Sequence, residues 1–200
     1  MLSKEQVKAF KEKGFIVVKE FFTADEVDCI SSYLDDLRDR EPEPGNEAKY
    51  YETSPTTGDS ILVRIENVVS AENSEFSDLV ITDRVEACLT ELLGDAPVLF
   101  KEKINYKLPG CRPDKLHQDQ AAGWNAYCDF FITMAVAVDA NRRDNAALSF
   151  MSSGNYERTL MTAEWQPLSE IDPPYEPADE YALLEADPGD VIFVQTIHIV

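Results

Sequence analysis

The sequence predicts an α+β protein in which N-terminal helices precede an antiparallel β core. Three observations lead to this class: two helix-capping signals near the start, strand-like alternation after about residue 98, and turn residues between the later strands. Helices followed by a succession of strands are typical of a domain whose core is an antiparallel sandwich or barrel. The 200 residues suit a single domain, with a helical and edge-strand layer over 1–97 and the β core over 98–200.

Two helices and a strand are expected in the first 40 residues. Ser3-Lys4-Glu5-Gln6 has the pattern of a capping box, and Gly14 supplies the end of the first helix. The apolar run over 15–18 predicts a short buried strand. A second capping signal, over 23–26, opens a helix that runs to about Arg40.

The middle of the chain is expected to alternate between loop, strand and helix. Residues 41–58 are rich in Pro, Gly, Thr and acidic residues and predict a surface loop. Residues 61–69 predict a strand that carries Arg64 and Glu66, and 78–93 predict a helix closed by Gly94. Further strands are expected at 98–108, 130–138, 146–151 and 191–194, and a proline-punctuated loop at 165–179.

The net charge of −20 narrows the partners of this protein. It arises from 38 acidic and 18 basic residues. The excess of negative charge would repel nucleic acid phosphates and anionic lipid. We therefore expect neither nucleic acid nor a membrane as a partner. Solubility or a saline habitat explains such a surface, and the functional alternative is steering of a cationic substrate.

The chain carries the features of a cytoplasmic protein. Residues 1–20 lack the apolar core of a signal peptide, and the longest apolar runs fall well short of the roughly 20 residues that span a bilayer. The four cysteines are widely spaced and contain no C-x-x-C, which indicates reduced cysteines rather than a zinc or dithiol site.

The segment His117-Gln118-Asp119 carries the clearest chemical signal. On a β-strand, residues two apart point to the same face, so an imidazole and a carboxylate can bind one ion together. A histidine and a carboxylate are two of the three ligands of the facial triad of non-haem Fe(II) oxygenases. One alternative is a strand-end histidine that hydrogen-bonds to a nearby aspartate. A cupin-type isomerase or metal-binding protein is another, although such sites usually use more histidines than the two present here.

The surrounding segments resemble the phytanoyl-CoA dioxygenase family of Fe(II)/2-oxoglutarate oxygenases over nearly the whole chain. The segments that carry this resemblance are residues 2–6, 14–18, 22–27, 64–67, 103–110, 117–119 and 189–193. The stretch 99–124, with Glu164-Trp165 later, looks most similar to the branch that oxidises small aminophosphonates and quaternary-ammonium relatives.

The resemblance implies a double-stranded β-helix, also called a jelly roll or cupin-like core, behind the N-terminal helices. It also implies Fe(II) as cofactor, 2-oxoglutarate as cosubstrate, and O2 with a small, cationic or zwitterionic organic molecule as further partners. His117 and Asp119 match the first two iron ligands, and Arg64 matches a basic residue that contacts 2-oxoglutarate. Lys103 and Asn105 match a strand that lines the cosubstrate pocket.

Trp124 would stand at the mouth of the pocket, where its aromatic face could hold a cationic group. Tyr127 is a weaker candidate for the same wall. Each assignment has a structural alternative. Arg64 can pair with Glu66 or solvent, Lys103 and Asn105 can be exposed strand residues, and Trp124 can cover the end of the barrel.

The sequence departs from the family near its end. Relatives carry the distal iron-binding histidine about eleven residues after the glycine matched by Gly189, which leads to Val200, whereas His198 comes two residues earlier. The arginine that clamps 2-oxoglutarate and the last barrel strand would follow Val200. We therefore expect a truncated or alternative product, for which His198 is an open candidate as third ligand.

Two functions remain open from the sequence. The first is a dioxygenase that hydroxylates a small organic substrate while it converts 2-oxoglutarate and O2 to succinate and CO2. The second is a catalytically inactive, truncated member of the family or a binding module.

Overall fold

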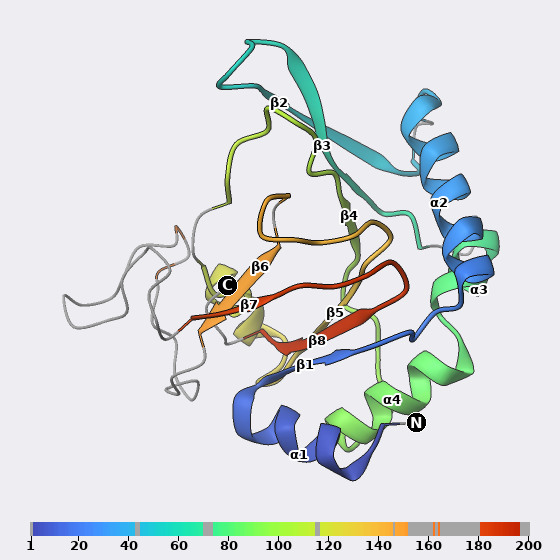
Figure 1. The fold of residues 1–200 in the computed structure, drawn as a ribbon, viewed down its shortest axis with the longest axis vertical. Helices are drawn as coiled ribbons and strands as arrows, with labels where there is room; N and C mark the ends of the chain where they lie inside the picture. The colour runs from blue at the N-terminus through green and yellow to red at the C-terminus, as the bar shows by residue number, and fades with distance from the viewer. Residues whose placement is uncertain are drawn as a thin grey trace. The chain divides into compact units, whose positions relative to one another are not determined.

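The structure is a computed structural model that describes residues 2–42, 45–69, 74–114, 117–145, 147–151, 162, 164 and 181–196 (Figure 1). The chain divides into two compact units, which are described separately. One unit comprises residues 24–113, and the other combines residues 2–23 with residues 114–200. The predicted single domain, with a boundary between its layers at residue 97, stays a prediction.

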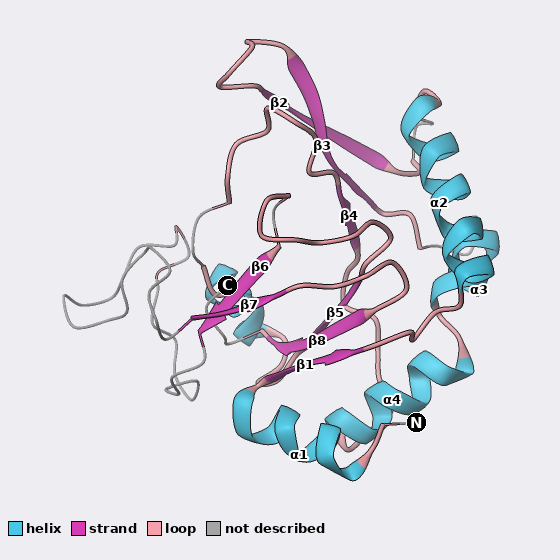
Figure 2. Ribbon diagram, viewed as in Figure 1, coloured by secondary structure: helices cyan, strands magenta, loops and turns pink. Residues whose placement is uncertain are grey.

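The second unit, residues 2–23 with 114–200, is built around two antiparallel sheets. Its elements are α1 (Lys4–Lys13), β1 (Phe15–Val18), η1 (Asp119–Ala122), η2 (Trp124–Ala126), β5 (Ile132–Val136), β6 (Leu148–Met151), β7 (Tyr181–Leu184) and β8 (Val191–Gln195). In the first sheet β8 lies between β1 and β5, and β6 pairs with β7 in the second sheet (Figures 1 and 2). The predicted capping box at Ser3 is present, and Gly14 ends α1 with a φ of 78°.

Apolar side chains on one face of the three-stranded sheet form the core of this unit with the β6–β7 pair. Phe15 and Thr133 both pair with Val194, so the three side chains share a face. The rings of Phe15 and Phe150 lie 5.6 Å apart. The buried members of the cluster are Phe15, Ala137, Phe150, Ala186, Ile192 and Val194. The alternating apolar positions of β1, β5 and β8 therefore build the interior.

The turn that leads into β8 is fixed by a buried carboxylate. Asp190 is 1% exposed and accepts hydrogen bonds from Lys19 Nζ at 2.6 Å, from the Glu20 amide at 2.9 Å and from the Asp187 amide at 2.7 Å. Burial acts to raise the pKa of this carboxyl, but these hydrogen bonds outweigh burial and hold the pKa below its usual value. The residues Asp187 to Asp190 thus tie the start of β8 to the end of β1.

The first unit combines three helices with a three-stranded antiparallel sheet. Its elements are α2 (Ala24–Asp39), β2 (Ala48–Thr53), β3 (Ser60–Glu66), α3 (Ser74–Val80), α4 (Asp83–Leu93) and β4 (Lys103–Asn105), with β3 between β2 and β4. The rings of Tyr33 on α2 and Phe76 on α3 stack at 4.9 Å. The helix predicted after residues 23–26 is present as α2, and it buries the side chains of Val27, Ile30 and Leu37.

Three sequence predictions of local structure were wrong in part, and one strand was missed. Residues 41–58 are not all loop, because β2 pairs with β3 from Ala48 to Thr53. The helix expected over 78–93 is two helices, separated where Thr82 caps the start of α4. The strand expected over 98–108 is only β4, because β3 ends at Glu66 and offers residues 98–102 no partner. Strand β7 was not predicted.

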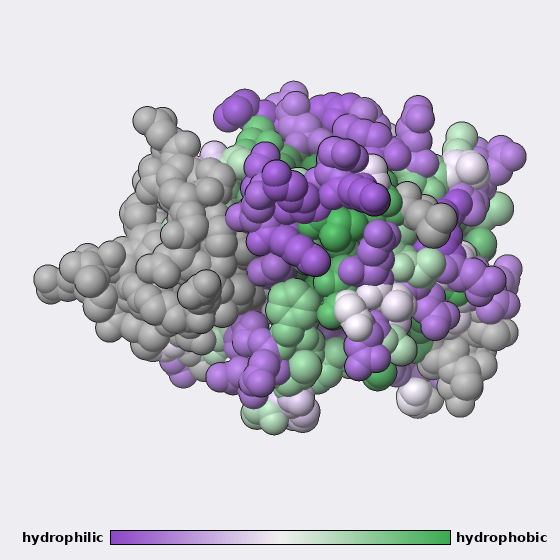
Figure 3. Space-filling view, turned by 90° about the horizontal axis from the view of Figure 1, so that it is seen from below, coloured by the Kyte–Doolittle hydropathy of each residue, from purple (hydrophilic) through white to green (hydrophobic). Residues whose placement is uncertain are grey.

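The described surface is rich in polar and charged side chains. Figure 3 shows hydrophilic side chains over much of one face, with apolar areas between them. This distribution agrees with the net charge of −20. Among the described residues, no helix is both long and apolar enough to cross a membrane.

Candidate metal centre

His117 and Asp119 converge as the sequence predicts, but not on a strand. Asp119 is the first residue of the 3-10 helix η1, and Gln118 before it has an extended backbone with φ −110° and ψ 120°. Even so, His117 Nε2 lies 3.4 Å from Asp119 Oδ1. Their side chains are 16% and 19% exposed, which leaves the pair partly desolvated and still open to small solutes.

The second oxygen of Asp119 has a different neighbour. The hydroxyl of Thr133, on β5, donates to Asp119 Oδ2 at 3.5 Å. The carboxylate therefore presents one oxygen to His117 and the other to Thr133. Thr133 is the one polar residue in the apolar run 130–138, and this isolated position was the signal in the sequence that could have pointed to it.

The separation of the two donor atoms fits a shared divalent ion. Two donors bound at about 2.1 Å with octahedral angles lie about 3.0 Å apart, close to the observed 3.4 Å. An imidazole nitrogen and a carboxylate oxygen are also the donor types of the facial triad of Fe(II). Within the described part of the chain, no third histidine, cysteine or carboxylate completes a metal-binding group. His198 and Val200 lie outside the described residues.

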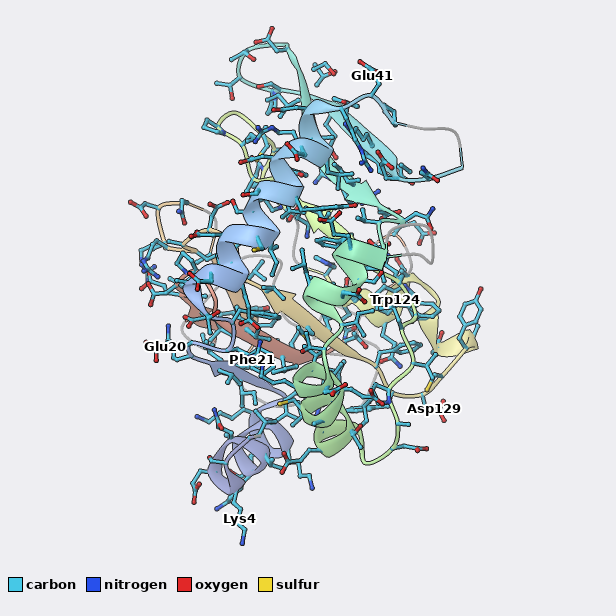
Figure 4. All side chains as sticks on the ribbon, turned by 90° about the vertical axis from the view of Figure 1, so that its right-hand side faces the viewer. Lys4, Glu20, Phe21, Glu41, Trp124 and Asp129 are labelled. Atoms are coloured by element: carbon cyan, nitrogen blue, oxygen red, sulfur yellow. The ribbon has the colours of Figure 1, made fainter. Side chains whose placement is uncertain are left out.

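Trp124 follows the two candidate ligands on the short helix η2 (Figure 4). Its ring packs edge-on against Phe131 with centroids 5.6 Å apart. Tyr127, the weaker candidate, is 77% exposed. The indole is thus held by an aromatic neighbour while it remains partly exposed, as a residue that contacts a substrate requires.

Arg64, Lys103 and Asn105 come together on one face of the sheet in the first unit. Asn105 pairs with Arg64 across β3 and β4, and Lys103 pairs with Glu66. Arg64 Nε lies 3.0 Å from Glu66 Oε1, and its guanidinium lies 4.4 Å from the centroid of the Tyr50 ring. The structural alternative for Arg64, pairing with Glu66, is therefore present in the structure. Lys103 and Asn105 are both exposed.

Residues 10–198 match the phytanoyl-CoA dioxygenase (PhyH) family. The chain is 32% identical over 190 residues to a 2-aminoethylphosphonate dioxygenase from an uncultured bacterium, which covers 95% of this chain and 71% of that protein. It is also 24% identical to a methylphosphonate hydroxylase from Gimesia maris, over 96% of this chain and 71% of that protein.

Solved structures of low sequence identity share the fold. EctD from S. alaskensis superposes with a TM-score of 0.74 at 21% identity, over 99% of this chain and 70% of that one. EvdO2 from Micromonospora carbonacea var. aurantiaca, complexed with 2-oxoglutarate, gives a TM-score of 0.73 at 16% identity, over 100% of this chain and 83% of that one. These matches show a cupin-like α+β fold.

The family match extends over almost the whole chain, and the residues of the predicted metal pair lie within it. The chain therefore belongs to the phytanoyl-CoA dioxygenase family and is a dioxygenase that depends on Fe(II) and 2-oxoglutarate.

Proposed function

We propose that this enzyme hydroxylates a small organophosphonate, with His117 and Asp119 as ligands of its Fe(II). The substrate class rests on one observation, the 32% identity to a 2-aminoethylphosphonate dioxygenase over 95% of the chain. The second relative, a methylphosphonate hydroxylase, points to the same class of compound. The reaction consumes substrate, 2-oxoglutarate and O2 and yields hydroxylated substrate, succinate and CO2.

The convergence of His117 and Asp119 supports their assignment as ligands. The neutral imidazole would bind through Nε2 and the carboxylate through Oδ1, since Oδ2 is engaged by Thr133. When bound, Fe(II) supplies the site at which O2 is activated by oxidation of 2-oxoglutarate. The protein's part is to hold the two donors at a fixed separation and to limit the access of water.

A zwitterionic aminophosphonate suits the partly exposed indole of Trp124. An ammonium group over an indole face gains a cation–π attraction, which is strongest when water is excluded. The acidic chain, with its net charge of −20, also favours approach of a cationic group. Trp124 is therefore proposed to select substrates that carry an ammonium group.

Arg64, Lys103 and Asn105 are proposed to contact 2-oxoglutarate, as the family resemblance implies. Their common face on β3 and β4 supports a joint role. Substitution Arg64→Gln is expected to raise the KM for 2-oxoglutarate and leave the KM for the phosphonate unchanged. Unchanged kinetics would assign Arg64 to its ion pair with Glu66 alone.

The proposed reaction is tested by succinate formation. The full-length protein is incubated with Fe(II), 2-oxoglutarate, O2 and either 2-aminoethylphosphonate or methylphosphonate. We expect succinate and hydroxylated phosphonate in equal amounts, and no coupled product from Asp119→Ala. If neither phosphonate supports coupled turnover, the proposed substrate class is wrong. Absence of any 2-oxoglutarate turnover would support the inactive-member hypothesis, which the relatives do not favour.

The proposal includes a cytoplasmic location. No disulfide joins any of the four cysteines, Cys29, Cys88, Cys111 and Cys128, as is typical of proteins in a reducing compartment. Localisation of a tagged full-length protein outside the cytoplasm would contradict it.

The third iron ligand is tested by the substitution His198→Ala. Loss of Fe(II) binding would identify His198 as the ligand, and unchanged affinity would exclude it.

A further inference from the structure

Gln120 directly follows Asp119, and both its backbone and its side chain form hydrogen bonds to other segments. Its backbone amide donates to the carbonyl of Thr196 at 3.2 Å. Its side-chain amide donates from Nε2 to the carbonyl of Asp129 at 3.3 Å. The hydroxyl of Thr196 donates to Gln120 Oε1 at 3.4 Å. The three contacts reach two separate segments, the end of β8 and the loop before β5.

The side-chain contact between Gln120 and Thr196 is buried, and the contact with the Asp129 carbonyl is partly buried. Gln120 is 8% exposed and Thr196 is 3% exposed. If the buried Gln120 amide lost one of these partners, a polar group would be left without a hydrogen bond, which costs free energy. The arrangement therefore depends on these particular partners. The carbonyl of Asp129 accepts, so the amide nitrogen must face it and the amide oxygen must face Thr196.

Thr196 is itself held by the central sheet. Its backbone amide donates to the carbonyl of Phe131 at 3.3 Å, next to the start of β5. The preceding residue, Gln195, donates to the carbonyl of Gly14 at 2.8 Å, at the end of α1. Figure 4 labels Trp124 and Asp129, which lie on the segment between Gln120 and β5. The turn that carries Asp119 and Gln120 is therefore hydrogen-bonded to the residue that follows β8, and β8 pairs with a strand on each of its edges.

We propose that Gln120 and Thr196 form a positioning pair that fixes the backbone of Asp119 and thereby sets the separation of the two iron ligands. This inference rests on the proposed role of His117 and Asp119. The peptide between Asp119 and Gln120 donates to Thr196, so a shift of the turn would move the Asp119 carboxylate relative to His117 Nε2. Groups that orient metal ligands typically change metal affinity by about 10–100-fold when they are removed.

The test compares Fe(II) affinity with folding stability. Fe(II) alone is titrated anaerobically into the full-length wild type, Gln120→Met and Thr196→Val by calorimetry, and thermal unfolding of each apoprotein is recorded. We expect both variants to bind Fe(II) about 10–100-fold more weakly. Thr196→Ser keeps the hydroxyl and should bind with affinity close to that of the wild type. The Val and Ser variants of Thr196 keep the test available if Gln120→Met does not fold.

The control variant is Asp190→Asn, which alters a buried polar residue whose side chain bonds to Lys19 and to the amides of Glu20 and Asp187. It should lower stability and leave Fe(II) affinity unchanged. If Gln120→Met and Thr196→Val lose stability but bind Fe(II) as the wild type does, the pair is structural only and the proposal is wrong. If the wild type itself binds no Fe(II), the proposed ligands fail and this proposal fails with them.

Discussion

At the scale of single residues, the Asp119 carboxylate divides its two oxygens between His117 and Thr133. Oδ1 lies 3.4 Å from His117 Nε2, and Oδ2 accepts from Thr133 Oγ1 at 3.5 Å. A carboxylate held in this way offers one oxygen to an ion and cannot rotate freely. The positions of His117 and Asp119 could be predicted because the chain has two histidines and one H-x-D segment. The contribution of Thr133 could not, because it depends on where β5 packs.

Loss of the Thr133 hydroxyl should loosen Asp119. Thr133→Val keeps the shape of the side chain and removes the hydrogen bond, so we expect Fe(II) affinity to fall by about tenfold, at the lower end of such effects. Thr133→Ser keeps the hydroxyl and serves as the control. Anaerobic Fe(II) titration of the three proteins checks this expectation, and equal affinity for Val and Ser variants would contradict it.

Trp124 should distinguish substrates by charge. A cation–π contact contributes about 0.5–2 kcal/mol, which corresponds to roughly 2–30-fold in affinity. Trp124→Ala should therefore raise the KM for 2-aminoethylphosphonate by such a factor and change the KM for methylphosphonate, which has no ammonium group, much less. Steady-state succinate formation measures both values. An equal rise for the two substrates would show that Trp124 acts only through packing against Phe131.

At the scale of elements, local signals predicted the helices better than the strands. The caps at Ser3 and Gly14 act within a few residues, so α1 could be predicted with its ends. Strand β2 was missed because its partner β3 lies beyond a turn in a segment of loop-like composition. Strand β4 was predicted too long because alternation over 98–108 does not reveal that its partner ends at Glu66. Strand pairing, which composition and alternation do not reveal, decided both strand errors.

The turn before β8 makes a prediction about acid stability. The pKa of Asp190 lies below its usual value, so its ionised form stabilises the fold above about pH 4, and this contribution is lost as the pH falls through the folded-state pKa. Asp190→Asn should lower the free energy of unfolding at pH 7 by about 1–3 kcal/mol. The difference between variant and wild type should shrink towards pH 2.

Urea unfolding across a pH series measures this difference. Lys19, whose pKa is raised chiefly by its hydrogen bond to Asp190, stays protonated from pH 7 to pH 2, since its pKa lies above the usual 10.5. The acid end of the series therefore reports on Asp190 without interference from Lys19. A difference that stays constant from pH 7 to pH 2 would contradict the assignment.

At the scale of the whole molecule, the fold class could be predicted and the complete site could not. The order of helices and strands suffices for an α+β protein, and EctD and EvdO2 confirm a cupin-like fold. The pair His117 and Asp119 follows from the sequence. The predicted contacts of Arg64, Lys103 and Asn105 with 2-oxoglutarate stay proposals, because these residues lie in the other unit of the chain.

The central claim is that His117 and Asp119 hold the catalytic Fe(II). The most direct test is an anaerobic titration of Fe(II) and 2-oxoglutarate into the full-length wild type, His117→Ala and Asp119→Ala. The signal measured is the weak visible charge-transfer band of the ternary complex. The wild type should develop the band, and both variants should lose it while each apoprotein remains folded. A band of wild-type intensity in either variant would contradict the assignment of that residue as an iron ligand.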